Sequence, residues 1–496
     1  MTQNDRPNLL IFMTDQQRGD TVYPYRRAYT PNLDKFAKEG LVFSRTYCPS
    51  PHCCPSRATF FSGLYPSEHG VWNNVRVGNA LSRGLKKGVR LFSEDLKEAG
   101  YRMYFSGKWH VSATENPDER GWDVSLLTTP KSDIIKEDGD WHEFDLAKNS
   151  WDKFRELAQN PVNTIRGEGQ ILRPGYSDFN QYGLNEEPFR DIEVVEDAIN
   201  IIHNRENSDE PWCQYIGTLG PHDPYFVPKR FLDMYDINDI ELPISFEDDM
   251  SDKPALYRRT RDRFDQLTER EHKESLRHYL AFCSYEDYLF GEVLKALEEK
   301  GEASNTVVIY TSDHGDYAGD HGLWCKGLPS FSTNYHIPAL MRWPKGIKNP
   351  GRCEESFVSL ADFAPTFLEL AGVPIQRKYA GESLVPFMMD EKPKKWRDEI
   401  YTQTNGNELY GIQRSVLTNE WKFVWNGFDY DELYDLKNDP HEMKNLAFYK
   451  EYQDVIQDMS AKMWRFAYEQ RDVCLNHYIM TALAAYGPSY AFRDEM

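Results

Sequence analysis

Short apolar runs alternate with helical patterns through the first three quarters of the chain. The runs suited to buried strands cover Leu9–Thr14, Leu41–Thr46, Tyr101–Ser106, Gln214–Leu219 and Thr306–Thr311. Apolar residues recur at helical spacing in Pro31–Glu39, Leu91–Ala99, Asp191–His203, Glu269–Lys300 and Ser359–Ala371. This alternation predicts an α/β fold with a large, mostly parallel sheet flanked by helices.

The pattern changes after about residue 373. Short strand-like segments with Asn and Gly turns between them follow at Glu399–Gln403, Leu409–Leu417, Trp421–Trp425 and Glu432–Tyr434. We therefore expect a first domain over residues 1–373. A C-terminal subdomain over residues 374–496 should hold a smaller antiparallel sheet, one helix and an aromatic-rich tail.

The composition is that of an ordinary globular protein. Hydrophobic residues make up 40% and aromatic residues 14% of the 496 positions, which is enough for a sizeable core. No apolar stretch approaches the roughly 18 residues that a membrane helix needs. The first apolar run is too short and wrongly flanked for a signal peptide, and the eight cysteines lack the spacing of a small disulfide scaffold. These features predict a cytoplasmic protein with reduced thiols.

The chain is strongly acidic. It carries 58 Lys and Arg against 79 Asp and Glu, for a formal net charge of −21. Long-range repulsion argues against a nucleic-acid or anionic-membrane partner. An anionic substrate would have to be held by a few concentrated cationic side chains.

A dense motif follows the second predicted strand, with the sequence Cys53-Cys54-Pro55-Ser56-Arg57 and Ser62-Gly63 shortly after it. From residue types alone, the two cysteines are either buried thiols or, with Cys48 and His52, part of a zinc cluster, although no second ligand pair with finger-like spacing lies nearby. The motif resembles the signature of the type I sulfatase family, within the alkaline-phosphatase-like superfamily. That family usually has Thr-Gly where this chain has Ser62-Gly63.

The resemblance implies a specific nucleophile. In the family a formylglycine-generating enzyme, which would be a partner of this chain, oxidises the signature cysteine to formylglycine, and that residue is Cys53 here. A thiolate attacking sulfur would leave a stable adduct, whereas the gem-diol of hydrated formylglycine gives a hemiacetal sulfate that collapses when its other hydroxyl loses a proton. Sulfate then leaves and the aldehyde returns.

Candidate metal ligands end two of the predicted strands. Asp15 follows the first strand, and Asp313 and His314 follow the strand at Thr306–Thr311. Strand ends share one edge of a parallel sheet, and oxygen-rich ligands suit a hard divalent ion. The resemblance implies one such ion, with Ca²⁺ favoured over Mg²⁺ or Mn²⁺, on Asp15, Asp313, His314 and the oxygen at position 53. Many members have a second Asp where this chain has Gln16, so the role of Gln16 as a ligand stays open.

The segment Ser106-Gly107-Lys108-Trp109-His110 also follows a predicted strand. The two-residue spacing places Lys108 and His110 on the same side of an extended segment. The segment resembles the family's Gly-Lys-x-His motif. By that resemblance Lys108 binds a sulfate oxygen, and His110 contacts the gem-diol and takes the proton that triggers sulfate release.

Two later segments complete the cationic set. They are Gly220-Pro221-His222-Asp223-Pro224-Tyr225 and Gly319-Asp320-His321-Gly322-Leu323-Trp324-Cys325-Lys326-Gly327. By resemblance His222 and Lys326 grip the sulfate and protonate the leaving oxygen, in a division that the sequence leaves open, while His321 is structural. Arg57 would steady the formylglycine with its planar donors.

The resemblance extends to the C-terminal pattern Glu432-Leu433-Tyr434-Asp435-Leu436, followed by Asp439-Pro440 and Glu442. Together the motifs predict hydrolysis of a sulfate monoester, of a small carbohydrate or an aryl alcohol. Trp72, Asn73 and Asn74 could line a pocket for that group or simply pack. The alternative is a phosphonate monoester or phosphodiester hydrolase of the same fold. A non-catalytic binder of sulfated ligands is disfavoured by the complete set of chemical residues.

Overall fold

The computed structural model describes residues 6–132, 144–206, 208–407, 409–476 and 479–495. Its centre is a sheet with strand order β14-β2-β13-β11-β1-β9-β4-β5. In that order the strands span Arg352–Glu354, Leu41–Phe43, Ala339–Arg342, Thr306–Ser312, Asn8–Thr14, Trp212–Gly217, Arg102–Gly107 and Asp123–Leu127. Only β13 runs antiparallel to its neighbours among these strands, so the predicted mostly parallel sheet is confirmed.

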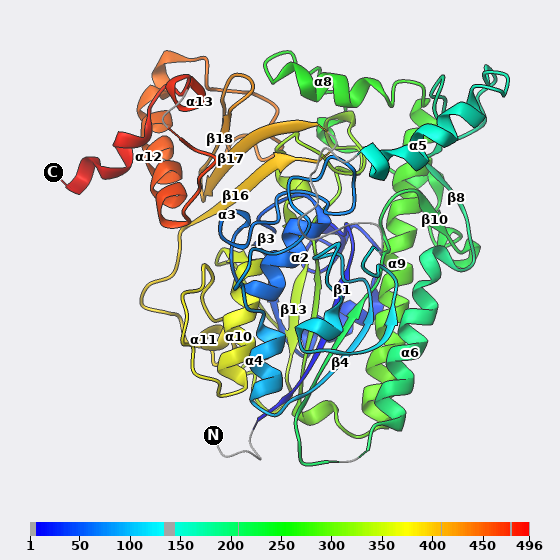
Figure 1. Cartoon of the computed structure of the whole chain (residues 1–496), viewed down its shortest axis with the longest axis vertical. Coiled ribbons are helices and arrows are strands. Elements are labelled where there is room, and N and C mark those ends of the chain that lie inside the picture. The colour runs from blue at the N-terminus through cyan, green and yellow to red at the C-terminus, as the bar shows by residue number, and fades with distance from the viewer. Residues whose placement is uncertain (1–5, 133–143, 207, 408, 477–478, 496) are drawn as a thin grey trace.

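Helices cover both faces of this sheet (Figure 1). Because side chains alternate along a strand, Leu9, Ile11 and Met13 of β1 pack on one face and Leu10 and Phe12 on the other. The first face is covered by α2 (Cys53–Ser62), α4 (Phe92–Glu98) and α10 (Phe363–Leu370). The second is covered by α1 (Pro31–Lys38), α6 (Asp191–Asn204) and α9 (Glu269–Glu299).

Three of the expected boundaries were wrong. The run Leu41–Thr46 is divided, because the polar pair Ser44-Arg45 turns the chain between β2 and β3 (Thr46–Tyr47). β3 pairs with β12 (His336–Ile337) and β15 (Val358–Ser359), so the expected helix Ser359–Ala371 begins as a strand and a 3-10 turn, Leu360–Asp362, before α10. The fourth run lies two residues earlier than expected, since Thr218 to Gly220 form a turn after β9.

The C-terminal part forms the smaller antiparallel sheet, with order β16-β17-β18-β19. Its strands span Glu399–Gly406, Tyr410–Thr418, Trp421–Asn426 and Glu432–Asp435. Helix α12 (Gln453–Glu469) packs on it through Ile456, Met459, Met463 and Trp464. Figure 1 shows this sheet and helix in orange and red above the edge of the main sheet.

Short elements connect these layers. They are η2 (Gly19–Thr21), α3 (Pro66–His69), η3 (Pro117–Arg120), α5 (Phe144–Leu157), β6 (Gln170–Ile171), β7 (Phe179–Asn180), β8 (Tyr182–Leu184), η4 (Pro188–Arg190), β10 (Tyr225–Val227), α7 (Lys229–Leu232), η5 (Ile237–Asp239), η6 (Ile244–Glu247), α8 (Ala255–Asp262), η7 (Ala303–Asn305), η8 (Asp320–Gly322), η9 (Ser332–Asn334), α11 (Val385–Met388), η11 (Lys450–Tyr452), α13 (Ile479–Ala482) and η12 (Pro488–Glu495). Within the described ranges, no helix has the length and apolar character needed to cross a membrane.

Candidate active site

The chemical residues meet at the carboxyl edge of the central sheet. Strand β1 pairs with β11 and β9, and β9 pairs with β4, so the ends of these four strands are neighbours. Each delivers one segment to the same place, and the amino-terminal end of α2 approaches it with Cys53 as its first residue. The delivered side chains are Asp15 after β1, Asp313 and His314 after β11, Lys108 and His110 after β4, and His222 after β9.

Four side chains form a compact buried cluster. Ligand atoms of Asp15, Cys53, Asp313 and His314 all lie within 4.8 Å of one another. Cys53 Sγ lies 3.7 Å from Asp15 Oδ1 and 3.3 Å from His314 Nε2. The same Nε2 is 3.7 Å from Oδ1 of both aspartates. The sequence predicted this set of four, and the fold brings it together.

The outer oxygens of the two aspartates are already engaged. Arg57 Nε lies 2.7 Å from Asp313 Oδ2, while Arg57 Nη2 and Lys108 Nζ both contact Asp15 Oδ2. The pKa of Asp15 is therefore held well below its usual range: burial raises it, but Lys108, His222 and Arg57 lower it further. Asp15 is ionised, and its Oδ1 faces Cys53 Sγ and His314 Nε2.

The imidazole of His314 is oriented with Nε2 toward Cys53 and the two aspartates. Its Nδ1 lies 2.8 Å from the carbonyl oxygen of Gly315, which can only accept, so Nδ1 carries the proton and Nε2 presents a lone pair. That lone pair lies 3.7 Å from Oδ1 of Asp15 and from Oδ1 of Asp313, although Asp313 Oδ1 also accepts from the backbone N–H groups of Gln16 and His314. Such a convergence of buried acceptors fits a bound cation.

Arg57 is fully buried and holds several parts of the site together. Besides the two aspartates, it donates to Tyr215 Oη at 2.8 Å and to the carbonyl oxygen of Lys108 at 3.2 Å. Tyr215 belongs to β9 and lay outside the sequence predictions, because a tyrosine within a buried apolar strand reads as core. The guanidinium group therefore fixes the cluster relative to β4 and β9.

Gln16 does not face the acidic cluster. Its Oε1 accepts from Lys326 Nζ at 2.8 Å, and its Nε2 donates to Asp223 Oδ1 at 3.0 Å and to Asp316 Oδ2 at 2.6 Å. The residue has a φ of 68°, which turns the chain sharply after Asp15. In this arrangement the amide oxygen of Gln16 orients the ammonium group of Lys326.

Lys326 and His222 form a second pair beside the cluster. Lys326 Nζ lies 2.7 Å from His222 Nε2, and His222 Nδ1 lies 2.5 Å from the carbonyl oxygen of Asp223. The lysine therefore donates to an imidazole whose other nitrogen donates to the carbonyl. Burial and Lys326 lower the pKa of His222, but Asp223, Cys53 and Asp15 raise it above its usual value. A proton can pass between these two nitrogens.

His110 approaches Cys53 from β4. Its backbone has a φ of 55°, and its backbone N–H donates to Thr129 Oγ1 at 3.2 Å. Burial lowers the pKa of His110 to about 4, although its hydrogen bond with Cys53 raises it. The ring is therefore neutral near pH 7 and can accept a proton. His110 therefore contacts the thiol, while Lys108, two residues earlier, contacts Asp15 and acts on the thiol through its charge.

The cationic surroundings act strongly on Cys53. Burial alone would raise the pKa of this thiol, but Lys108, Lys326 and His314 lower it well below its usual value. Its neighbour Cys54 is different, because burial and Cys53 raise the pKa of Cys54. Of the two cysteines, the site thus stabilises negative charge only on Cys53.

The proposed pocket residues have mixed roles. Asn73 Oδ1 accepts from the backbone N–H of Leu81, and the Arg414 guanidinium lies over Trp72, so both side chains pack. Asn74 is placed between the signature helix and the C-terminal sheet, because its backbone N–H donates to Asn407 Oδ1 at 2.9 Å. His321 is structural, as expected, and its Nδ1 lies 2.7 Å from Asp248 Oδ2.

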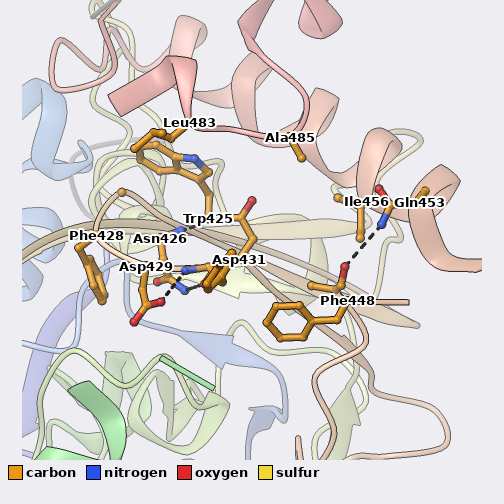
Figure 2. Close-up of a pocket in the computed structure, with 13 residues that line it drawn as sticks. Trp425, Asn426, Phe428, Asp429, Asp431, Phe448, Gln453, Ile456, Leu483 and Ala485 are labelled. Carbon is orange, nitrogen blue, oxygen red and sulfur yellow. Dashed lines mark hydrogen bonds between the residues drawn. The ribbon is translucent and has the colours of Figure 1, made fainter. Parts of the chain in front are cut away.

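A separate pocket lies in the C-terminal part (Figure 2). Its lining includes the aromatic side chains of Trp425 and Phe448, with Leu483 beside Trp425 in this view, and the carboxyl groups of Asp429 and Asp431. None of the residues that form the acidic cluster or its cationic surroundings lines it. The pocket is therefore distinct from the candidate active site.

Comparisons with known proteins identify the family of the chain. A family model described as "Sulfatase" matches residues 7–373, and one described as "N-sulphoglucosamine sulphohydrolase, C-terminal" matches residues 319–469. The choline-sulfatase of Rhizobium meliloti is 29% identical over 460 residues, which cover 89% of this chain and 82% of that protein.

Two solved structures share the fold. The phosphonate monoester hydrolase of Agrobacterium radiobacter superposes with a TM-score of 0.74 at 22% identity, covering 95% of this chain and 97% of that one. A protein crystallised with its substrate D-glucosamine-2-N,6-O-disulfate gives a TM-score of 0.70 at 23% identity, covering 94% and 99%. The alkaline-phosphatase-like architecture is thereby confirmed.

Proposed function

The chain belongs to the sulfatase family and hydrolyses sulfate esters, and from this premise we propose that formylglycine made from Cys53 is its nucleophile. Under this proposal an oxygen of formylglycine would take the place of Cys53 Sγ. The observation that carries the proposal is the position of Cys53, whose Sγ lies 3.7 Å from Asp15 Oδ1 and 3.3 Å from His314 Nε2 in the buried cluster. The cations that lower the pKa of this thiol would equally stabilise an oxygen nucleophile there. Maturation requires a formylglycine-generating enzyme as a partner.

We propose further that one divalent cation binds beside this nucleophile. Asp15, Asp313 and His314 would hold it, with the oxygen at position 53 as a further ligand. Two carboxylates make a hard, oxygen-rich set, which favours Ca²⁺, with Mg²⁺ or Mn²⁺ as alternatives. When bound, the ion would fix the nucleophilic oxygen and offset negative charge that develops on the sulfuryl group.

The residues around the cluster divide the remaining work. Lys108 binds a sulfate oxygen from the β4 side, and Lys326 binds one from the opposite side. Their charges stabilise the sulfuryl group where negative charge develops. His110, neutral near pH 7, takes a proton from the hydroxyl at position 53 to release sulfate.

The Lys326–His222 pair serves the leaving oxygen. The two nitrogens are 2.7 Å apart and share a hydrogen bond, so either can pass a proton to an alkoxide or phenoxide. A poor leaving group depends on this proton more than a good one does. The pair therefore matters most for sugar sulfates.

The substrate is proposed to be the sulfate monoester of a small carbohydrate or an aryl alcohol. The solved structure with a sulfated glucosamine supports the first class, and the choline-sulfatase relative shows that small alcohols also fit the family. Asn74 accepts from the backbone N–H of Cys54 through Oδ1 and donates its own backbone N–H to Asn407, and its side-chain NH₂ is the group we propose for sugar hydroxyls.

The test is to produce the protein with and without a formylglycine-generating enzyme. Peptide mass at position 53 and sulfate release from aryl, sugar and choline sulfates are then measured on both preparations. We expect conversion of the thiol to an aldehyde together with sulfate release, and neither in Cys53→Ala. Full conversion without release from any sulfate ester would overturn the proposal.

The same panel tests the alternative substrate class. Phosphonate monoesters and phosphodiesters are tetrahedral anions like sulfate esters, and a hydrolase of phosphonate monoesters shares the fold. If these esters turn over at a higher kcat/KM than every sulfate ester, the protein is primarily a phosphonate or phosphodiester hydrolase.

A further inference from the structure

We propose that a buried cradle behind the active site positions His222 for its work on the leaving group. The cradle comprises four side chains from two helices and the turn before one of them: Phe189, Asp191, Phe282 and Glu286. The inference rests on the proposed role of His222. It adds residues that contact neither the acidic cluster nor the sulfate.

The cradle holds the turn that follows β9. Within this turn the carbonyl oxygen of Gly217 accepts from the backbone N–H of Lys108 at 2.9 Å, and that of Gly220 accepts from Asp15 at 3.0 Å. The turn ends at His222, whose backbone N–H bonds back to the carbonyl oxygen of Leu219. Arg57 independently holds the Lys108 carbonyl oxygen and Asp15, so a looser turn would act mainly on His222.

The side chain of Asp191 binds the backbone of the turn. One carboxylate oxygen accepts from the N–H of Leu219 at 2.9 Å, and the other accepts from Gly220 at 2.8 Å. Asp191 is fully buried and is the first residue of α6. A carboxylate that accepts two consecutive backbone N–H groups fixes the peptide planes of the turn.

Glu286 supports the turn from α9. Its Oε2 accepts from Thr218 Oγ1 at 2.7 Å, and its Oε1 lies against Gly220, where an added Cβ would meet it at 2.2 Å. Gly220 is therefore required by the close approach of the carboxyl group. Oε1 of Glu286 is buried and has no hydrogen-bond partner among the described residues.

The two carboxyl groups carry at most one negative charge between them near pH 7. Burial and Asp191 raise the pKa of Glu286 well above its usual value, so Glu286 is neutral near pH 7. The backbone bonds favour the ionised form of Asp191, although burial raises its pKa to about 7. Glu286 thus accepts from the Thr218 hydroxyl as a neutral carboxyl group. A glutamine amide at position 286 could accept the same hydrogen bond.

Phe189 completes the cradle on the imidazole side. Its ring meets His222 edge to face at 6.3 Å and stacks on Phe282 at 6.0 Å. Phe189 and Arg190 have φ values of 52° and 60°, a left-handed conformation that residues with a side chain rarely adopt. Such strain is retained where the surroundings require it, and here it brings Phe189 to His222 and Asp191 to the turn.

The test compares four proteins: wild type, Asp191→Asn, Glu286→Leu and Glu286→Gln. Formylglycine content and metal content are measured first. Values of kcat/KM then follow for sulfate esters of graded leaving groups, from 4-nitrophenyl sulfate to an alkyl sulfate. Asn cannot accept two N–H bonds with its NH₂ group, and Leu cannot accept from Thr218. Gln can still accept from that hydroxyl.

We expect Asp191→Asn and Glu286→Leu to lose about 10- to 100-fold on the alkyl sulfate and less than about 5-fold on the nitrophenyl ester, because misplacing a general acid penalises poor leaving groups. Glu286→Gln should recover most of the loss. Equal losses on both esters, or full activity in Asp191→Asn, would overturn the proposal.

A second measurement does not depend on activity. Hydrogen–deuterium exchange of the peptide spanning residues 217–222 should be at least about 10-fold faster in Asp191→Asn than in wild type, with Glu286→Gln near wild type. Unchanged exchange would refute the positioning role. If the wild type released no sulfate, the proposed function would fail. The exchange measurement would still test whether the cradle orders the turn.

Discussion

Binding of a divalent cation should measurably stabilise the folded protein, because the acidic cluster leaves three acceptor atoms facing one another. These are Oδ1 of Asp15, Oδ1 of Asp313 and Nε2 of His314. Unfolding disperses them, so the ion binds the native state in preference. At a free concentration of 100 times Kd, one such site adds about 2.7 kcal/mol to the free energy of unfolding.

The size of the chain sets the expected shift of Tm. An unfolding entropy of roughly 2.1 cal/mol/K per residue gives about 1 kcal/mol/K for 496 residues. The stabilisation by the ion therefore corresponds to an increase of about 3 °C. The assay is thermal unfolding of chelator-treated protein, repeated with Ca²⁺, Mg²⁺ and Mn²⁺ at increasing concentrations.

Asp313→Asn is the decisive variant. It removes one inner oxygen's charge, and we expect its cation-induced shift to fall below about 1 °C. Asp316→Asn is the matched control, since this buried carboxyl group lies three residues away and bonds instead to Gln16 and Tyr225. Its baseline Tm can fall, but its cation-induced shift should match that of wild type. Equal shifts in Asp313→Asn and wild type would refute the assigned ligand set.

Three further predictions concern other parts of the chain. Cys54→Ala should retain sulfate release when Cys53→Ala abolishes it, measured on matched preparations co-expressed with the maturing enzyme. Burial lowers the pKa of His69 to about 3, so this ring is neutral in the folded protein. Its contribution to the free energy of unfolding should therefore be fully present above pH 6.5 and fall by about 1.4 kcal/mol for each pH unit below 6.5. Urea unfolding at pH 7 and 5 should show about 2 kcal/mol less acid sensitivity in His69→Gln. Lys422→Met should lower the free energy of unfolding by about 3–5 kcal/mol, because the buried Glu442 carboxylate, which accepts from Lys422 Nζ at 2.6 Å, would lose its cation. Adding Glu442→Leu should recover part of this loss in the same assay.

Much of the site followed from the sequence because its residues sit where strands end. Asp15, Lys108 and Asp313 each come directly after an apolar run, and parallel strands bring such positions to one edge. Local pattern and the signature motif therefore carried the information. The boundaries failed where polar residues interrupt the run, as at Ser44-Arg45, and where turn bonds end β9 before its apolar run does.

The cradle could not have been found in this way. Glu286 lies in a helix whose apolar spacing says nothing of whether a carboxyl group is neutral, and Asp191 reads as an ordinary first-turn residue. Their common contact with the turn at Thr218–Gly220 spans 28 to 68 positions of sequence. Only the packing of α6 against α9 brings the two carboxyl groups together.

The charges of the site explain why Gln16 suits its position. Arg57 pairs with Asp313, and Lys108 pairs with Asp15, so much of their charge is already balanced. Among the described residues, Lys326 donates to the neutral Gln16 Oε1 and lies 2.7 Å from His222 Nε2, without a carboxylate at ion-pair distance. An aspartate at position 16 could pair with Lys326 and offset its charge. The glutamine instead orients the lysine and leaves its charge for the incoming sulfate, so a chain with a net charge of −21 can attract an anion at this point.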